Sequence, residues 1–167
     1  KANVDIVHED DELLVVNKPA GLLTHPDRTE QKDTLITRVH AYLYRKGALD
    51  SRLFLPATAN RLDRNTSGLV LIGKTAGCLH RLNEWVQRRE IGKYYVTIVH
   101  GTLAGEGVIR AALVRDERAN RTKVSDADEA MDAVTRYKPL HASEGYTLVE
   151  VELESGRTQQ IRSPFQS

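Results

Sequence analysis

Apolar and polar residues alternate along this chain with two different periods, which predict strands in some segments and helices in others. Six short segments have the apolar run or the alternation typical of strands: residues 4–9, 13–17, 69–72, 94–99, 133–137 and 147–153. In the last segment Val149 and Val151 fall on one face, whereas Glu150 and Glu152 fall on the other. This pattern predicts a sheet with one face in contact with water.

Two other segments repeat apolar residues every three or four positions, as amphipathic helices do. The apolar face of the first comprises Leu35, Val39 and Leu43. Its expected cap is Asp33 or Thr34, and Gly47 is the expected stop. The apolar face of the second comprises Leu79, Leu82, Trp85 and Val86. This second helix is expected to begin after a cap near Thr75.

The order of these segments is that of a mixed α/β protein, and the length is consistent with a single domain. A chain of 167 residues buries enough surface to fold without disulfides or metal ions. No internal repeat or low-complexity linker divides it, so we expect one domain over residues 1–167. Residues 115–130 are polar and charged, which predicts a mobile excursion from that domain.

Composition argues against several classes of protein. The only cysteine, Cys78, cannot form an internal disulfide and is expected to be a small buried side chain. No apolar run approaches the roughly 20 residues that span a bilayer, and the first residues do not resemble a signal peptide. The six histidines show no zinc-ligand spacing. We therefore expect a soluble, cytoplasmic protein without a metal site or membrane partner.

The charge of the chain is unevenly distributed although the net charge is only +1. Residues 34–123 hold 16 Lys and Arg against 7 Asp and Glu, whereas the segments on either side each carry a net charge of −4. A basic middle segment favours binding of a polyanion such as RNA, provided that the fold gathers these charges on one face.

Residues 60–68 read Asn-Arg-Leu-Asp-Arg-Asn-Thr-Ser-Gly and contain the strongest candidate for catalysis. Asp63 lies between Arg61 and Arg64, immediately before an apolar run. Neighbouring guanidinium groups favour the charged form of a carboxylate, so Asp63 is able to act as a nucleophile at neutral pH. The alternative interpretation is a solvated turn with an exposed aspartate.

The same region also matches the pattern of a nucleotide-binding phosphate loop, from Gly68 to Thr75. Such a loop needs pliant residues between its glycines so that backbone N–H groups turn toward phosphate. The intervening residues here are Leu, Val, Leu and Ile, which favour a strand. An NTPase is therefore ranked last of the three functions considered for this chain, after the two that are described below.

Residues 60–68 resemble the signature His-Arg-Leu-Asp-x-x-Thr-Ser-Gly of the RluA-type pseudouridine synthases, which isomerise uridine in RNA without a cofactor. Three further stretches resemble the family in the same order. They are Asn-Lys-Pro-Ala-Gly at 17–21 with His25 and Pro26, Lys-Tyr-Tyr-Val at 93–96 with Gly101, and Gly-Arg-Thr-Gln-Gln-Ile-Arg at 156–162. The resemblance covers nearly the whole chain, and it implies a largely antiparallel mixed sheet with flanking helices and a central catalytic cleft near Asp63.

The resemblance also implies the site residues. Asp63 corresponds to the catalytic aspartate, Arg162 to its basic partner and Tyr95 to the tyrosine that stacks against uracil. Arg61 corresponds to the side chain that fills the space left by the flipped base. The last two expected contacts are Arg64, to phosphate, and Ile161, beneath the ring.

The chain departs from the family pattern in two ways. Asn60 and Gln159 replace histidines, although both can still form hydrogen bonds. The chain ends five residues after Arg162, which implies an active site without its usual C-terminal wall. The expected function is isomerisation of uridine in ribosomal or transfer RNA by a monomer without cofactors; the alternative is a noncatalytic RNA-binding relative.

Overall fold

The computed structural model describes residues 3–49, 54–116, 121–124 and 131–154. The chain divides into two compact units, residues 1–88 and 89–167. Asp63 belongs to the first unit and Tyr95 to the second. Ile161 and Arg162 lie outside the described residues.

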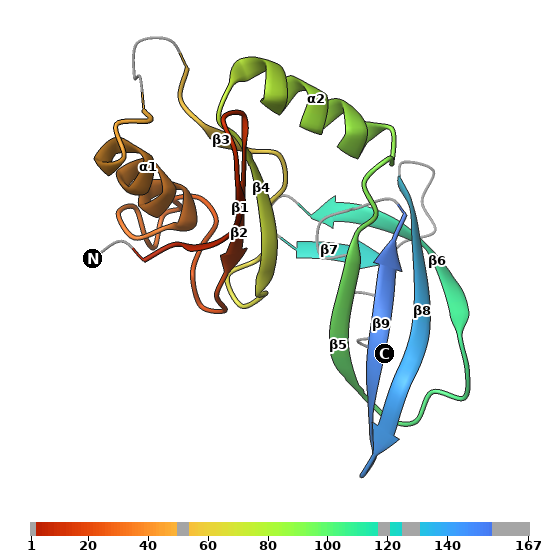
Figure 1. Cartoon of the computed structure of the whole chain (residues 1–167). Coiled ribbons are helices and arrows are strands. Elements are labelled where there is room, and N and C mark those ends of the chain that lie inside the picture. The colour runs from red at the N-terminus through yellow and green to blue at the C-terminus, as the bar shows by residue number, and fades with distance from the viewer. Residues whose placement is uncertain (1–2, 50–53, 117–120, 125–130, 155–167) are drawn as a thin grey trace. The chain divides into compact units, whose positions relative to one another are not determined.

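The first unit contains a four-stranded antiparallel sheet in the order β1-β2-β4-β3 (Figure 1). Its strands are β1 (Asp5–Glu9), β2 (Leu13–Lys18), β3 (Ala57–Thr58) and β4 (Gly68–Gly73). The turn from β1 to β2 is held by Asp10, whose carboxylate accepts hydrogen bonds from the backbone N–H groups of Glu12 and Leu13. This tight connection places β1 directly beside β2.

The register between β2 and β4 determines which side chains form the core of this unit. Leu14 pairs with Ile72 and Val16 with Val70, and all four are fully buried. Because side chains alternate along a strand, the next residue on the same face of β2 is Lys18, which is also fully buried. A lysine thus continues a row of apolar core residues.

Two helices accompany the sheet, α1 (Leu35–Arg45) and α2 (Ala76–Gln87), and they lie on different sides of it (Figure 1). Thr34 caps α1 in a capping box with Thr37, and Thr75 caps α2. The expected apolar face of α1 is buried: Leu35, Val39 and Leu43. The expected apolar face of α2 is only partly buried, because Leu82 is buried but Trp85 is 43% exposed.

The second unit contains a five-stranded antiparallel sheet in the order β5-β9-β8-β6-β7. Its strands are β5 (Tyr94–His100), β6 (Gly107–Asp116), β7 (Arg121–Val124), β8 (Met131–Ser143) and β9 (Tyr146–Leu153). Val149 and Val151 on β9 are fully buried, as their alternation predicts.

The α/β class, the antiparallel pairing and the position of both helices confirm the predictions from sequence. The strands divide into one sheet per unit. The sequence predicted a mobile excursion over residues 115–130 but no strand within it, whereas residues 121–124 pair with β6 as β7. Alternating polar residues at the edge of a sheet have the same composition as a loop, so composition alone did not distinguish them.

Candidate active site

Asp63 lies on the loop that connects β3 to β4 in the first unit. The side chains of Arg61, Asp63 and Arg64 are all exposed. The loop turns immediately after Asp63, because the N–H of Thr66 donates a hydrogen bond of 3.1 Å to the carbonyl of Asp63. The three charged side chains are therefore presented to solvent from a short, turned segment. We call residues 60–67 the Asp63 loop.

The residue before Asp63 is held by a buried hydroxyl group. Thr24 is 2% exposed, and its Oγ1 donates a hydrogen bond of 2.7 Å to the carbonyl of Leu62. The same oxygen accepts a hydrogen bond of 3.1 Å from the N–H of Leu62. One side chain thus satisfies both backbone groups of a buried residue, which fixes the peptide unit next to the carboxylate.

The residue after Asp63 is held by two donors. The carbonyl of Arg64 accepts a hydrogen bond of 3.0 Å from the buried Nζ of Lys18 and one of 2.7 Å from the N–H of Gly21. Gly21 has φ of +89°, a conformation that favours glycine. Residues 17–21, one of the stretches that resemble the family, therefore hold the backbone of the Asp63 loop through Lys18 and Gly21.

The Asp63 loop is also held by side-chain hydrogen bonds at its first residue, Asn60, and in its middle, at Arg64. The side-chain amide of Asn60 donates to the carbonyl of Leu69 at 3.1 Å and accepts from the N–H of Leu71 at 2.8 Å. Arg64 donates to the hydroxyl of Thr29 at 2.7 Å. Asn60, which replaces a histidine of the family pattern, thereby joins the loop to β4 through one amide group that both donates and accepts a hydrogen bond.

Two histidines contact the chain at β3, just before this loop. His25 is hydrogen-bonded to the hydroxyl of Thr58 at 2.8 Å, and the Nε2 of His40 donates to the carbonyl of Pro56 at 2.7 Å. Burial lowers the pKa of His25, and the positive charge of Arg61 and the proximity of His40 lower it further. The lowered pKa favours the neutral form of His25, which lies next to Thr58 where the chain leads into the Asp63 loop.

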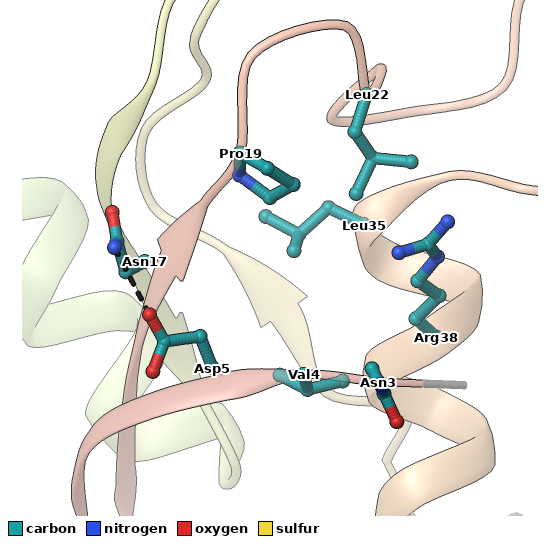
Figure 2. A pocket seen from close by; sticks show the side chains of 8 residues that line it. All are labelled: Asn3, Val4, Asp5, Asn17, Pro19, Leu22, Leu35 and Arg38. Carbon is teal, nitrogen blue, oxygen red and sulfur yellow. Dashed lines mark hydrogen bonds between the residues drawn. The ribbon is translucent and has the colours of Figure 1, made fainter. Parts of the chain in front are cut away.

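A hollow of about 270 Å³ opens beside Arg64, lined by the turn at residues 19–23 and by Glu30, Asp33 and Arg38. A second hollow, of about 220 Å³, lies on the Leu35 side of the same turn (Figure 2). The side chains of Asn17 and Asp5 in the second hollow are hydrogen-bonded to each other, and Arg38 is paired with Asp33. These four side chains are thus already hydrogen-bonded within the protein.

Tyr95 lies on β5 in the second unit, where Tyr94 and Tyr95 point to opposite faces of the strand. Tyr94 is 62% exposed, and its hydroxyl donates to Glu152 at 3.2 Å. Tyr95 is half-buried and pairs in register with the buried Val151. The role of Tyr95, like those of Ile161 and Arg162 beyond the described residues, stays a prediction.

Sequence analysis missed two residues that the fold places under the Asp63 loop, Lys18 and Thr24. A signal for Lys18 was present, since it follows Leu14 and Val16 on the face of β2 that the alternation predicts to be buried. A lysine at a core position needs several hydrogen-bond partners. Nothing in the sequence pointed to Thr24, because its partner Leu62 is 38 residues away.

Within the described ranges, no group of three or more His, Cys, Asp or Glu side chains comes together in a way that holds a metal ion. The expectation of a reaction without metal remains a prediction. In that part of the chain, neither helix is long and apolar enough to cross a membrane.

Comparison with known proteins connects this chain to one family. A family model described as RNA pseudouridylate synthase matches residues 12–167. The ribosomal large subunit pseudouridine synthase D of Xylella fastidiosa is 34% identical over 159 residues, which are 95% of this chain and 46% of that protein. An uncharacterized RNA pseudouridine synthase of Bacillus subtilis, YlyB, is 32% identical over 161 residues, 96% of this chain and 52% of that protein.

A solved structure gives the same result at the level of the fold. Human RNA Pseudouridylate Synthase Domain Containing 4 superimposes with a TM-score of 0.74 at 26% identity, covering 95% of this chain and 62% of that one. The chain spans about half the length of the curated relatives that it matches.

Proposed function

Because this chain belongs to the RNA pseudouridylate synthase family, we propose that it isomerises uridine to pseudouridine in RNA, with Asp63 as the catalytic carboxylate. The observation that carries this proposal is the Asp63 loop itself. It exposes one carboxylate between two arginines, while buried groups of Thr24 and Lys18 hold the backbone on both sides. A nucleophile gains most from such rigid placement.

Each exposed side chain of the loop has a proposed role. Asp63 adds to the uracil ring or to the ribose while the glycosidic bond breaks; the base then rejoins through carbon five, and the bond to Asp63 breaks, which regenerates the carboxylate. Arg61 takes the place of the flipped base, since a planar guanidinium stacks on neighbouring bases and binds phosphate. Arg64, whose guanidinium already contacts Thr29, binds phosphate from the other side of the loop.

Three further residues complete the proposed site. Tyr95 stacks against the uracil ring and assists removal of the proton from carbon five. Arg162 pairs with Asp63, and Ile161 packs beneath the ring to limit water around that pair. In this proposal the two units act together as one catalytic domain. The match of residues 12–167 to the family supports these roles.

We propose that the substrate is a uridine in ribosomal or transfer RNA. We also propose that the protein acts in the cytoplasm as a monomer and needs no cofactor. The Xylella relative is named for the ribosomal large subunit, which favours ribosomal RNA. Sequence-specific readers of RNA act on unstacked loops, so the preferred substrate is an RNA whose target uridine lies outside a regular helix.

The NTPase alternative loses its support in the fold. The residues between the two glycines of the phosphate-loop pattern are strand β4, paired on both sides with β2 and β3. The Nζ of Lys74 donates to the carbonyl of Asp10 at 2.6 Å and lies 3.3 Å from Glu9. A lysine engaged in this way holds the β1–β2 turn, and the backbone N–H groups of a strand are not directed at phosphate.

The test is tritium release from RNA labelled at carbon five of uridine, without added metal or nucleotide. Asp63→Asn keeps the size and exposure of the side chain but removes the nucleophilic charge. We expect release by the parent chain, none by Asp63→Asn, and RNA binding by both. Lys74→Ala serves as the matched control that keeps its activity.

Two outcomes decide between the alternatives. Binding of RNA without release by the parent chain favours the noncatalytic relative. Turnover by Asp63→Asn excludes Asp63 as the nucleophile.

A further inference from the structure

The hollow beside Arg64 lies against the Asp63 loop. It has a volume of about 270 Å³, and its lining comprises the turn at residues 19–23 with Glu30, Asp33, Arg38 and Arg64. The N–H of Gly21 in this turn donates a hydrogen bond of 2.7 Å to the carbonyl of Arg64, the residue after Asp63. A group bound in the hollow is therefore held next to the proposed catalytic carboxylate.

Glu30 uses one carboxylate oxygen on the backbone and leaves the other free. Its Oε1 accepts hydrogen bonds from the N–H groups of Lys32 at 2.7 Å and Asp33 at 2.9 Å. The N–H groups of Asp33 and Lys32 lower the pKa of Glu30, so its carboxylate is ionised at neutral pH. Oε2 has no hydrogen-bond partner among the described residues. Glu30 therefore offers the hollow an ionised acceptor whose orientation is fixed by the backbone.

Two arginines supply donors to the same hollow. Arg38 donates through Nε and Nη2 to the two carboxylate oxygens of Asp33, at 2.6 and 2.8 Å, and its Nη1 has no partner in the described part of the chain. Arg64 donates through Nη2 to Thr29 at 2.7 Å, which leaves its Nε and Nη1 for a ligand. The hollow thus combines a free carboxylate oxygen with free guanidinium N–H groups.

This combination argues against a phosphate group or a metal ion inside the hollow. The carboxylates of Glu30 and Asp33 repel a phosphate. A metal ion finds too few ligands, because both oxygens of Asp33 are bonded to Arg38 and no group of three suitable side chains occurs in the described ranges. A neutral group with both donors and acceptors fits instead, and in RNA that group is the edge of a base.

The size and the polar groups of the hollow favour guanine. Its volume of about 270 Å³ is just below the roughly 300–1,000 Å³ of pockets for drug-sized ligands, which suits a single base. Guanine presents two adjacent donors, N1–H and the N2 amino group, beside the acceptor O6. One carboxylate oxygen accepts from both donors, and a guanidinium donates to O6. Adenine and cytosine present a ring-nitrogen acceptor where guanine presents N1–H, and uracil has no amino group.

We propose that this hollow is a subsite for a guanine base next to the target uridine, in which Glu30 selects the base and Arg38 donates to O6. This inference rests on the proposed function, because the neighbour of a uridine held at Asp63 belongs to the same RNA strand. Arg64, the proposed phosphate contact, binds the phosphate of the nucleotide whose base enters the hollow. Glu30 is thus a specificity-determining residue outside the reacting groups.

The first experiment measures binding without any enzyme activity. The probes are short, fluorescently labelled single-stranded RNAs with one uridine, flanked on both sides by guanosine, inosine or adenosine. Kd is measured by fluorescence anisotropy at a fixed salt concentration, since the affinity for RNA depends on salt. We expect the guanosine RNA to bind about 10- to 100-fold more tightly than the adenosine RNA, and the inosine RNA, which lacks only the N2 amino groups, to lie between them. Equal Kd values for the guanosine and adenosine RNAs overturn the proposal.

Glu30→Gln tests the selecting residue. Glutamine keeps one oxygen for the backbone N–H groups but replaces the free Oε2 with an amino group, which cannot accept. We expect the ratio of Kd between the adenosine and guanosine RNAs to fall below about threefold. Glu84→Gln removes the same charge from another half-buried glutamate, on α2 of the same unit, and is the matched control that keeps the parental ratio. A Glu30→Gln variant that folds and keeps the parental ratio excludes Glu30 as the selecting residue.

The second experiment, tritium release from the same RNAs labelled at carbon five of uridine, separates this proposal from the proposed function. Release without any preference for the guanosine RNA in Kd keeps the proposed function and excludes the guanine subsite. A guanosine preference that Glu30→Gln abolishes, in a parent chain that releases no tritium, keeps the subsite and favours the noncatalytic relative. If Glu30→Gln does not fold, the Kd values of the parent chain for the three RNAs decide.

Discussion

Replacement of Thr24 by Val tests whether a single hydroxyl group holds the Asp63 loop. The two side chains have nearly the same shape, so the change exchanges a buried hydroxyl for a methyl group. In the parent chain that hydroxyl donates to the carbonyl of Leu62 at 2.7 Å and accepts from its N–H at 3.1 Å. Both residues are buried, with Thr24 at 2% and Leu62 at 7% exposure, so water does not readily replace the lost partner.

The expected magnitude follows from the two backbone groups that lose their partner. A buried donor or acceptor left unsatisfied costs about 1–3 kcal/mol. With two such groups on one residue, we expect the free energy of unfolding to fall by about 2–4 kcal/mol. A domain with a stability of about 5–15 kcal/mol stays folded after such a loss, so activity can be measured on the same variant.

The assay is urea unfolding at 25 °C, followed by tritium release from the folded variant. Thr24→Ser is the matched control, because it keeps the hydroxyl and loses only a methyl group, about 0.8 kcal/mol. We expect Thr24→Ser to remain close to the parent chain in stability and activity. We expect Thr24→Val to be less stable and less active than the parent chain. A Thr24→Val variant within about 0.5 kcal/mol of the parent, or a Ser variant as unstable as Val, refutes the reasoning.

Three further predictions follow from other contacts. A Cβ at Gly73 meets the backbone of α2 at 2.7 Å, whereas a Cβ at Gly77 has 3.9 Å to its nearest neighbour. In thermal unfolding, Gly73→Ala is therefore expected to destabilise by about 1–3 kcal/mol and Gly77→Ala to stabilise by about 0.5–1 kcal/mol; equal shifts contradict this packing. Because burial lowers the pKa of His25 from 6.5, the unfolded chain binds the proton more readily, and stability falls as pH drops below that value. For His25→Gln, the melting temperature is expected to change less between pH 7.5 and about 5.5 than it does for the parent chain. Parallel curves of melting temperature against pH for the two proteins contradict this prediction. Arg61→Ala is expected to raise KM for RNA while unfolding changes by less than about 0.5 kcal/mol, and unchanged kinetics return Arg61 to an ordinary surface charge.

The sequence by itself predicted both helices and most of the strands of the described residues, and it singled out residues 60–68 as the candidate reactive segment. Apolar period placed α1 and α2 with their threonine caps, and the run after Gly68 was a strand as its composition predicted. These features are local, since a cap, a turn or an amphipathic face depends on residues within a few positions of one another. The order Arg-Leu-Asp-Arg likewise specified an exposed carboxylate between two cations.

Only the tertiary structure decided what holds that carboxylate in place. Thr24 reaches Leu62 across 38 residues, and Lys18 reaches Arg64 across 46. These contacts depend on the register of β2 against β4, which brings the turn after β2 beneath the loop before β4. Sequence pattern reports which side chains prefer burial, but a buried polar group is satisfied by partners that folding selects from anywhere in the chain.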